Sequence, residues 1–584
     1  MSNLLPYLFL FSNELHQIKV KKISSQVILR PTSESLIVQK STRSHTPHAK
    51  EYKKRGHIVD VSSLTSILSV NDNIVVAEGQ VSMKQLCSET LRHYRMPPLV
   101  PELSDFTCAG LVNGLGIQSS SHRYGLFPDN LVAFEAVLGD GTIVIASRDD
   151  PETSNLFFDL PGSYGTLGIV TAIALRLIPA GPFVRSKYRL FTTVSSFDTA
   201  LKDAVDQTHS EGSFDSNKKG CTFVEGFVYS QSLYILVESE YTNHPGGLPL
   251  HDTNAPGAEW YHQHVEASGK CGGQDGFEDV LETLDYIFRL ERGFWWFIEY
   301  TVGLKAFTDT VYGRNLLDRA VEEQVKNLPT GINSWAGQSS NINWTADDMH
   351  RCNVHQDMGV KLKRVEEVIQ YTQKKLGVYP IWICPFVVFG PKGALWNSGY
   401  GRVADVEVKT GRASKTLSNN FLNEARRIAD PTDPIPWHYP SEISKPSPGF
   451  PFMACDIGLY GEPTVSGFKC RRDIRELQCL VDVPAFWGMS YLTSNELTER
   501  YDFQQYEKSR REFRAEKAVG LEETAKSPLL DIREKISFFD PTKPDLGPIP
   551  FWRLHRAGLV PSTTVTVVCL ALTSIAVSLL LQKK

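Results

Sequence analysis

Three glycines within seven residues, at positions 110, 114 and 116, restrict what residues 102–125 can form. Three serines at 119–121 follow directly. Glycine and small hydroxyl residues together allow backbone amides to turn inward and to approach a ligand closely. Because residues 96–122 contain no Lys or Arg, a phosphate bound here would be held by amides and hydroxyl groups.

We expect this glycine–serine stretch to be an irregular loop. Its Gly-x-Gly at 114–116 is like the first part of a dinucleotide-binding fingerprint. Ser119 stands at the last position of that pattern, however, and no helix pattern follows it. Glycine clusters also form tight turns that bind nothing, so the stretch alone does not decide between a ligand cradle and a turn.

The segments on either side predict regular structure. IVVAE at 74–78 indicates a buried strand, and Ser82 is suited to cap a helix after a turn at Gly79. The apolar face of that helix comprises Met83, Leu86, Cys87 and Leu91. AFEAVLGDGTIVIAS at 133–147 predicts a hairpin with its turn at 139–141. A second glycine-rich element occupies 155–171, and Pro179 is expected to end the strand after it.

Length and composition exclude several classes of protein. A chain of 584 residues has room for about two to four domains. An apolar share of 41% and a charged share of 22% are ordinary for a globular protein, which excludes whole-chain disorder, collagen and a polytopic membrane protein. A net charge of −5 leaves no basic field for non-specific nucleic-acid binding. Ten cysteines without a C-x-x-C pair predict no zinc or other metal site, and they fit a reducing compartment.

The two ends of the chain differ in character. Residues 560–582 are uncharged, and about 20 such residues span a bilayer core. We expect a C-terminal transmembrane helix, with a buried core helix or an amphipathic hairpin as the alternative. Basic residues at 553–556 then place the body in the cytosol. The apolar run at 4–11 is too short to span and lacks the flanks of a signal peptide.

The order of the blocks in the N-terminal third resembles the FAD-binding domain of the vanillyl-alcohol oxidase (PCMH) type. The shared features are the E-G turn at 78–79, the glycine–serine stretch, the hairpin and GTLGIVT at 165–171. Within that superfamily, 102–127 resembles the delta-24 sterol reductases, the 24-dehydrocholesterol reductase family. So do VEGF at 224–227, HQDM at 355–358, VYPIWICPF at 378–386 and DIGLYGEP at 456–463. The resemblance covers about residues 55–520 with gaps.

The resemblance implies an α+β fold with a two-subdomain FAD-binding domain and an α/β cap domain that binds substrate. The expected units are an N-terminal segment 1–23, the FAD-binding domain 24–182, the cap domain 183–530 with an insert near 387–455, a Pro-rich linker 531–559 and the anchor 560–582. Seven prolines within 431–451 support the insert as a surface loop.

The implied activity is that of an oxidoreductase acting on CH–CH groups, in which FAD and NADPH saturate the C24–C25 double bond of a sterol side chain. The expected partners are a sterol substrate and the lipid bilayer, with no nucleic acid. The expected location is the endoplasmic reticulum membrane, with the Golgi as an alternative. Two other functions stay open: an FAD-linked oxidase or dehydrogenase of the same fold, and a catalytically inactive membrane-bound relative.

The resemblance places FAD against both glycine-rich elements. The implied FAD-binding residues are Thr107, Cys108, Ala109, Gly110, Leu111, Val112, Asn113, Gly114, Leu115, Gly116, Ile117, Gln118, Ser119, Ser120, Ser121, His122, Gly125, Gly165, Gly168 and Ile169. Ala109 stands where the family has Gly, and its methyl group could crowd the pyrophosphate. His122 could orient the flavin or carry a covalent link, but the R-x-G-G-H pattern of such links is absent, so we expect non-covalent FAD.

Saturating an isolated alkene needs a proton donor, a hydride source and an apolar slot. The candidate catalytic residues are Tyr460, Glu462, Glu299 and His355. Tyr460 and Glu462 are expected in a Gly-flanked turn, where Glu462 could instead cap a loop. His355 and Asp357 are interpreted as an exposed pair on a helix or as an acid. Glu299, among aromatic residues at 295–300, is either a paired structural residue or an acid with a raised pKa.

Overall fold

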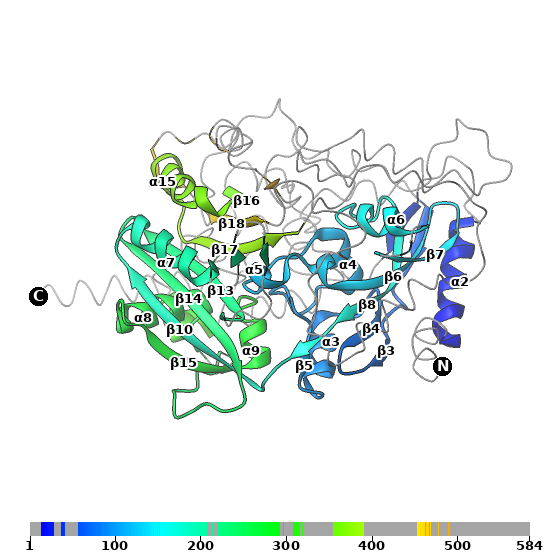
Figure 1. Cartoon of the computed structure of the whole chain (residues 1–584), viewed down its shortest axis with the longest axis horizontal. Coiled ribbons are helices and arrows are strands. Elements are labelled where there is room, and N and C mark those ends of the chain that lie inside the picture. Colours follow the sequence, from blue (N-terminus) through cyan, green and yellow to red (C-terminus); the bar gives the residue numbers. More distant parts are fainter. Residues whose placement is uncertain are drawn as a thin grey trace, which may run out of the picture.

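The computed structural model describes two β-sheets and the helices packed on them (Figure 1). The described residues are 13–28, 37–40, 57–148, 150, 152–206, 209–210, 213–214, 220–253, 255, 257–292, 296, 308–315, 318, 354–389, 452–461, 463–466, 468, 473, 477 and 489–490. The mixed helix and strand content agrees with the predicted α+β class.

The N-terminal sheet has five strands in the order β3-β4-β8-β6-β7. Their bounds are β3 (Ile67–Val70), β4 (Ile74–Glu78), β8 (Ile169–Arg176), β6 (Leu131–Val137) and β7 (Ile143–Ser147). Neighbouring strands are antiparallel. Among the described residues, three short pairs lie outside the two large sheets: β1 (Ile37–Lys40) with β2 (His57–Asp60), β5 (Arg95–Met96) with β9 (Ile178–Pro179), and β11 (His209–Ser210) with β12 (Ser213–Phe214).

The second sheet, called the cap sheet here, has eight strands in the order β15-β10-β14-β13-β17-β18-β16-β19. Their bounds are β15 (Phe277–Glu282), β10 (Phe183–Phe191), β14 (Leu233–Thr242), β13 (Phe223–Ser230), β17 (Ile381–Val388), β18 (Phe452–Gly461), β16 (Val354–Lys361) and β19 (Met489–Ser490). Helices α7 (Val194–Asp206) and α15 (Val365–Lys375) join its apolar cluster on one face. Helices α8 (Tyr261–Gly272) and α9 (Thr283–Ile287) accompany the other face.

Three predictions for the N-terminal sheet are confirmed. All five residues of β4 are buried. Helix α3 (Met83–Leu91) begins after Ser82, whose hydroxyl accepts a hydrogen bond from the amide of Gln85 at 3.2 Å. Strands β6 and β7 form the expected hairpin, with Gly141 at φ +87° in its turn. Pro179, which was expected to end the strand after the second glycine-rich element, lies instead in the short strand β9, because β8 already ends at Arg176.

The prediction of an irregular loop in the glycine–serine stretch is wrong. Residues 108–114 form helix α4 (Cys108–Gly114), and residues 121–124 form the short helix α5 (Ser121–Tyr124). Thr107 caps α4 by accepting from the amide of Gly110 at 3.2 Å. Each glycine costs a helix about 1 kcal/mol, but the cap and the burial of Cys108, Leu111 and Val112 offset that cost.

Two predictions for the cap sheet also differ from the structure. His355 and Asp357 lie in strand β16 rather than on a helix, and Tyr460 lies in strand β18 rather than in a turn. The cause is alternation: Val354, Met358 and Val360 all point into the cluster beneath α7 and α15. The residues between them therefore face the opposite side of the sheet.

Helix α2 (Glu14–Ile28) packs on the outer side of the N-terminal sheet, away from the cap sheet (Figure 1). This helix continues past residue 23, where the N-terminal segment was predicted to end. The predicted domain limits are otherwise untested. Both ring nitrogens of His16 lie 2.9 Å from carboxylates, Nδ1 from Glu78 Oε1 and Nε2 from Glu135 Oε1. Burial alone would lower the pKa of His16, but the hydrogen bonds and charges of these two carboxylates raise it to about 9.

Raising the pH should therefore weaken the attachment of α2. The ordinary pKa of His16 is 6.5, so protonated His16 contributes fully to the free energy of unfolding below that pH. This contribution is lost as the pH rises through about 9. We expect a loss of about 3 kcal/mol of unfolding free energy between pH 7 and pH 10, measured by urea denaturation. His16→Gln should abolish most of this loss. The exposed His93→Gln is the matched control, and an equal pH dependence in all three proteins would contradict the assignment.

Candidate active site

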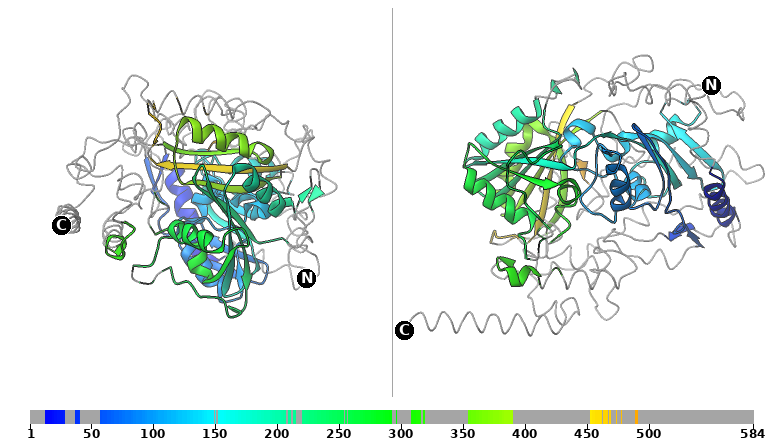
Figure 2. Two further views of the ribbon diagram at one scale, coloured as in Figure 1. Left: turned by 90° about the vertical axis from the view of Figure 1, so that its left-hand side faces the viewer. Right: turned by 90° about the horizontal axis from the view of Figure 1, so that it is seen from below.

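The glycine–serine stretch lies between the two sheets. Helix α5 packs against β17 and β13 of the cap sheet. Figure 1 shows α4 and α5 between the two sheets, which also lie side by side in the view from below (Figure 2, right). Leu115 and Leu126 from this stretch share an apolar cluster with Phe386, Val388 and Ala454 of the cap sheet. The predicted FAD-binding residues are thus held against the cap by packing.

Many amides of this stretch already have partners within the protein. The amide of Cys108 donates to Val81 O at 3.0 Å, and that of Ala109 donates to Gly79 O at 2.8 Å. The amides of Gly110 and Gln118 donate to Thr107 Oγ1 and Ser121 Oγ. These amides are committed to folding the stretch, so they are not the phosphate donors that the sequence pattern suggests.

Two glycines leave space that a bound group could fill. A methyl group at Gly114 would meet no heavy atom within 4 Å, and one at Gly110 would meet only Thr107 Oγ1 at 3.0 Å. At Gly116, by contrast, it would collide with Pro101 at 2.6 Å. Gly110 and Gly114 therefore fit close approach by a ligand, whereas Gly116 serves packing.

The second glycine-rich element meets the first at the end of α4. The amide of Gly165 donates to Asn113 Oδ1 at 2.8 Å, and that of Gly162 donates to Val112 O at 3.1 Å. The hydroxyl oxygens of Ser120 and Ser163, one from each element, are buried without a hydrogen-bond partner in the described part of the chain. Unpartnered buried hydroxyls and open glycine positions suit a polar group such as FAD.

Ala109 does not crowd this space. Its side chain is 7% exposed and packs in the core of the N-terminal sheet. It faces Gly79, where an added methyl group would lie 3.1 Å from the Ala109 Cβ. The glycine at 79 thus accommodates the methyl group at 109, and this departure from the family pattern concerns packing.

His122 is fully buried, and each of its ring nitrogens lies close to a carbonyl oxygen. Its Nδ1 lies 3.0 Å from Ser119 O, and its Nε2 lies 3.1 Å from Cys221 O. A covalent bond from His122 to a cofactor would require one of these interactions to break. The ring instead ties α5 to the segment that precedes β13, which favours FAD held without a covalent link.

Three further predicted FAD-binding residues, Gly125, Gly168 and Ile169, pack against other protein side chains. Gly125 has φ +68° and lies against Asp129 and Phe389. Gly168 packs against Leu160, and Ile169 lies in the cluster beneath α2.

A buried ion pair that the sequence analysis did not identify joins the stretch to the cap sheet. Arg289 and Glu225 are both fully buried, with Arg289 Nη2 2.8 Å from Glu225 Oε1. The same Nη2 donates to Gln118 Oε1 at 3.1 Å and to Ser119 Oγ at 3.0 Å. Trp382 Nε1 donates to the other oxygen of Glu225 at 3.0 Å. The sequence did contain a signal for this ion pair: Glu225 lies within the apolar strand FVEGFVYS, and a buried carboxylate needs a partner.

An acidic cluster lies beside this ion pair on the same face of the cap sheet. Tyr460 donates a hydrogen bond from its hydroxyl to Asp357 Oδ1. Asp456 precedes Tyr460 by four residues in β18, so both lie on the same face of the sheet, and Asp456 is 1% exposed. Glu102 approaches from the N-terminal domain, where it accepts from Gln118 Nε2 at 3.2 Å. The predicted candidates His355 and Tyr460 are direct cross-strand neighbours.

Gly458 allows this arrangement. Its cross-strand partner is Asp357, and a methyl group at Gly458 would lie 2.8 Å from the hydroxyl oxygen of Tyr460. The ring of Tyr460 therefore folds back over Gly458, and its hydroxyl reaches the neighbouring strand.

The environment shifts the proton affinities in this cluster. Burial, followed by the charge of Asp357, raises the pKa of Asp456 well above its ordinary value. Burial, followed by the charge of Asp357, likewise raises the pKa of Tyr460 above its ordinary value. The environment therefore favours the protonated forms of Asp456 and Tyr460. A carboxyl group that favours its protonated form close to a second carboxyl group is a frequent arrangement in catalytic sites.

Aromatic side chains surround the cluster. Trp296 Nε1 donates to Tyr460 O at 3.0 Å, and the Trp296 and Tyr460 rings lie 5.8 Å apart. Trp296 and Trp382 are fully buried, which places them in the core of this face. Glu299 and Glu462, and the side chain of His355, lie outside the described residues.

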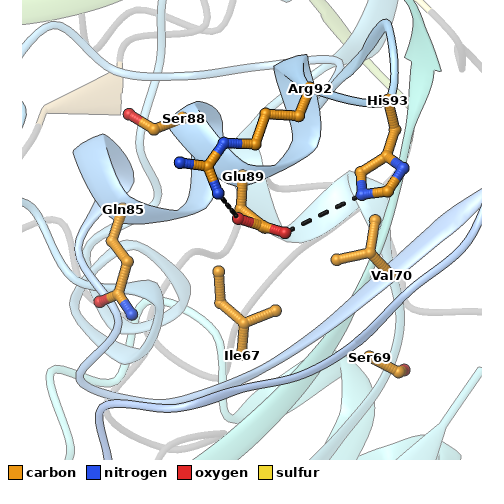
Figure 3. A pocket seen from close by; sticks show the side chains of 8 residues that line it. All are labelled: Ile67, Ser69, Val70, Gln85, Ser88, Glu89, Arg92 and His93. Carbon is orange, nitrogen blue, oxygen red and sulfur yellow. Dashed lines mark hydrogen bonds and ion pairs between the residues drawn. The ribbon is translucent and has the colours of Figure 1, made fainter.

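A separate surface pocket of about 660 Å³ lies between α3 and β3 (Figure 3). Its lining includes the Arg92–Glu89 ion pair. It contains no residue of the glycine–serine stretch or the cap sheet.

Among the described residues, no three metal-ligating side chains gather in a possible metal site. The described residues also include no helix long and apolar enough to cross a bilayer, and the expected anchor at 560–582 lies outside them.

Comparison with known proteins defines the class of the N-terminal domain. Residues 32–147 match the FAD binding domain family. The Delta(24)-sterol reductase of Pisum sativum is 31% identical over 347 residues, and that of Arabidopsis thaliana is 32% identical over 346 residues. Each plant alignment covers 58% of this chain and 58% of the relative. The Delta(24)-sterol reductase of Homo sapiens is 27% identical over 466 residues, which is 79% of this chain and 75% of the human protein.

The chain therefore carries an FAD binding domain. It is similar in sequence to the Delta(24)-sterol reductases named above, which confirms the resemblance inferred from its motifs. The matched region spans less than two thirds of the length of the two plant relatives.

Alanine substitutions at Gly114 and Gly116 should separate a ligand role from a packing role. Gly114→Ala should not lower the melting temperature of the flavin-free protein, because its methyl group meets no protein atom and alanine is favoured over glycine in a helix by about 1 kcal/mol. It should weaken FAD binding by about tenfold or more, since a displaced contact of about 1.4 kcal/mol has that effect. Gly116→Ala should lower the melting temperature instead, because of its clash with Pro101.

Flavin titration by fluorescence and thermal denaturation measure the two effects. If Gly114→Ala binds FAD as the wild type does, the proposed cradle at α4 is wrong.

Proposed function

We propose that this chain is an FAD-dependent oxidoreductase that uses NADPH to reduce the C24–C25 double bond of a sterol side chain. The observation that carries the proposal is the buried group of Tyr460, Asp357 and Asp456. It lies on the face of the cap sheet that meets the predicted FAD stretch. The relatives named Delta(24)-sterol reductases support the substrate class.

The chemistry of an isolated alkene explains why such a group is needed. The double bond has no neighbouring carbonyl group to stabilise a negative charge, so one carbon must receive a proton while the other receives a hydride. Bound FAD, reduced by NADPH, supplies the hydride. This chain's own residues supply the rest: protonated side chains in the acidic cluster, and aromatic residues around it that exclude water.

We further propose that the enzyme acts at the endoplasmic reticulum membrane, with its body in the cytosol and residues 560–582 as its anchor. Tethering suits a sterol substrate because the substrate resides in the bilayer and a slow transfer through water is avoided.

An anaerobic absorbance titration tests the proposed function. The purified full chain should show flavin bands near about 370 and 450 nm and should bleach on addition of NADPH. A sterol with a C24–C25 double bond should then restore the 450 nm band, while the saturated sterol should not. Acid denaturation should release the flavin, as expected for non-covalent FAD.

Two results would overturn the proposal. A colourless protein that FAD does not reconstitute would favour an inactive relative. A flavin that NADPH or another donor reduces, but that the unsaturated sterol does not reoxidise, would favour an oxidase or dehydrogenase acting on another substrate.

A further inference from the structure

Asp456 differs from Glu225 and Asp279, the other fully buried acids of the cap sheet that the structure describes, because those two have hydrogen-bond partners. It lies in β18, between β17 and β16, with Cys384 and Gly359 as its cross-strand partners. Its side chain is 1% exposed. Both carboxyl oxygens lack a hydrogen-bond partner of normal geometry among the described residues. The backbone amides of Met358 and Ile457 are near enough to stabilise its charge only weakly.

The groups that face Asp456 oppose its ionisation. Asp357 on β16 and Glu102 from the N-terminal domain both raise its pKa through their negative charges. On β17, the cross-strand neighbour Cys384 carries a thiol, which offers Asp456 no positive charge. The buried cation Arg289 is committed to Glu225 on β13. Asp456 is thus placed where its neutral, protonated form is favoured.

Tyr460 and Asp357 are already engaged with each other. The hydroxyl proton of Tyr460 is used in the hydrogen bond to Asp357, and that bond stabilises Asp357 as the anion. Transfer of the Tyr460 proton elsewhere would leave a phenolate beside this carboxylate. Asp456 makes no such hydrogen bond among the described residues. Its proton is therefore the one on this face that can be transferred.

We propose that Asp456, rather than Tyr460, gives up the proton in the reaction at this site, and this inference rests on the proposed function. The O–H bond of Asp456 breaks and a C–H bond forms at one alkene carbon. The other alkene carbon accepts a hydride, which is one proton together with two electrons. The chemical source of this hydride is the flavin reduced by NADPH. The alkene is thereby reduced and NADPH is oxidised, and Asp456 is left as a carboxylate.

Glu102 offers a route for returning the proton. It is partly exposed, whereas Asp456 is not, and its charge influences both Asp456 and Tyr460. The Asp456 carboxylate, surrounded by other acids, regains a proton readily because its ionised form is unfavourable there. Asp357 and Tyr460 act as positioning residues that keep a negative charge beside Asp456.

Infrared difference spectroscopy tests the protonation of Asp456 without any turnover. The wild-type spectrum minus that of Asp456→Asn, both as full chains at pH 7, should show the carbonyl stretch of a protonated carboxyl group. That band should shift in D2O. The control is Asp198→Asn, which removes a buried aspartate on α7, on the opposite face of the sheet. Absence of the band, or its loss in Asp198→Asn as well, would overturn the proposal.

Stability gives a second readout that does not depend on activity. The folded protein retains the Asp456 proton at pH values at which the unfolded chain, with an ordinary pKa of 3.8, has lost it. Wild-type stability should therefore fall as the pH rises above about 4, relative to Asp456→Asn. Asp456→Asn should melt at a higher temperature than the wild type at pH 7, and the difference should close near pH 4. The opposite order at pH 7 would contradict a neutral Asp456.

Half-reaction kinetics then distinguish Asp456 from Tyr460. Asp456→Asn should retain flavin and be reduced by NADPH at a rate within about twofold of the wild type, but its reoxidation by the unsaturated sterol should slow by about 10²-fold or more. Tyr460→Phe should slow the same step by less than about tenfold. The reverse ranking would assign the proton to Tyr460. If the wild type does not reduce the sterol at all, the proposed function fails, while the infrared and stability results still decide the state of Asp456.

Discussion

The buried ion pair between Arg289 and Glu225 is the interaction on which the arrangement of the site depends. Both side chains are fully removed from solvent, and a buried charge without its partner would cost several kcal/mol. The pair is satisfied from both sides: Trp382 and Tyr261 donate to Glu225, and Arg289 donates to Gln118 and Ser119. One guanidinium group thus fixes the glycine–serine stretch to a strand of the cap sheet.

The two faces of the cap sheet have separate tasks. One face presents Val354, Ile381 and Ile457 to the helices α7 and α15, and this apolar layer holds the strands in register. The alternating positions face the N-terminal domain and carry the acidic cluster around Asp456 and Tyr460. Because the side-chain period of a strand is two, a slip of one residue in β18 would exchange these faces. The packed layer therefore also fixes which side chains meet the predicted FAD stretch.

Local patterns in the sequence predicted local structure well. The Ser82 cap, the hairpin of β6 and β7 and the FAD-binding resemblance all depend on nearby residues, and each is confirmed. The helix α4 was missed because the glycines were interpreted as a loop signal and Thr107 was not considered as a capping residue. Arg289 and Gln118 are 171 positions apart, and Asp357 and Tyr460 are 103 apart. Such pairs are created by the fold, so no spacing rule could reveal them.

The central claim is that Arg289 positions the predicted FAD-binding stretch through its pairing with Glu225. The most direct test is a double-mutant cycle on the FAD dissociation constant, using Arg289→Met, Glu225→Gln and the double variant under conditions where all three are folded. Arg289→Met should weaken FAD binding by about tenfold or more, which corresponds to about 1.4 kcal/mol. The double variant should bind FAD within about twofold of Arg289→Met, because Glu225 acts through Arg289. Purely additive effects, or FAD binding unchanged by Arg289→Met, would contradict the account.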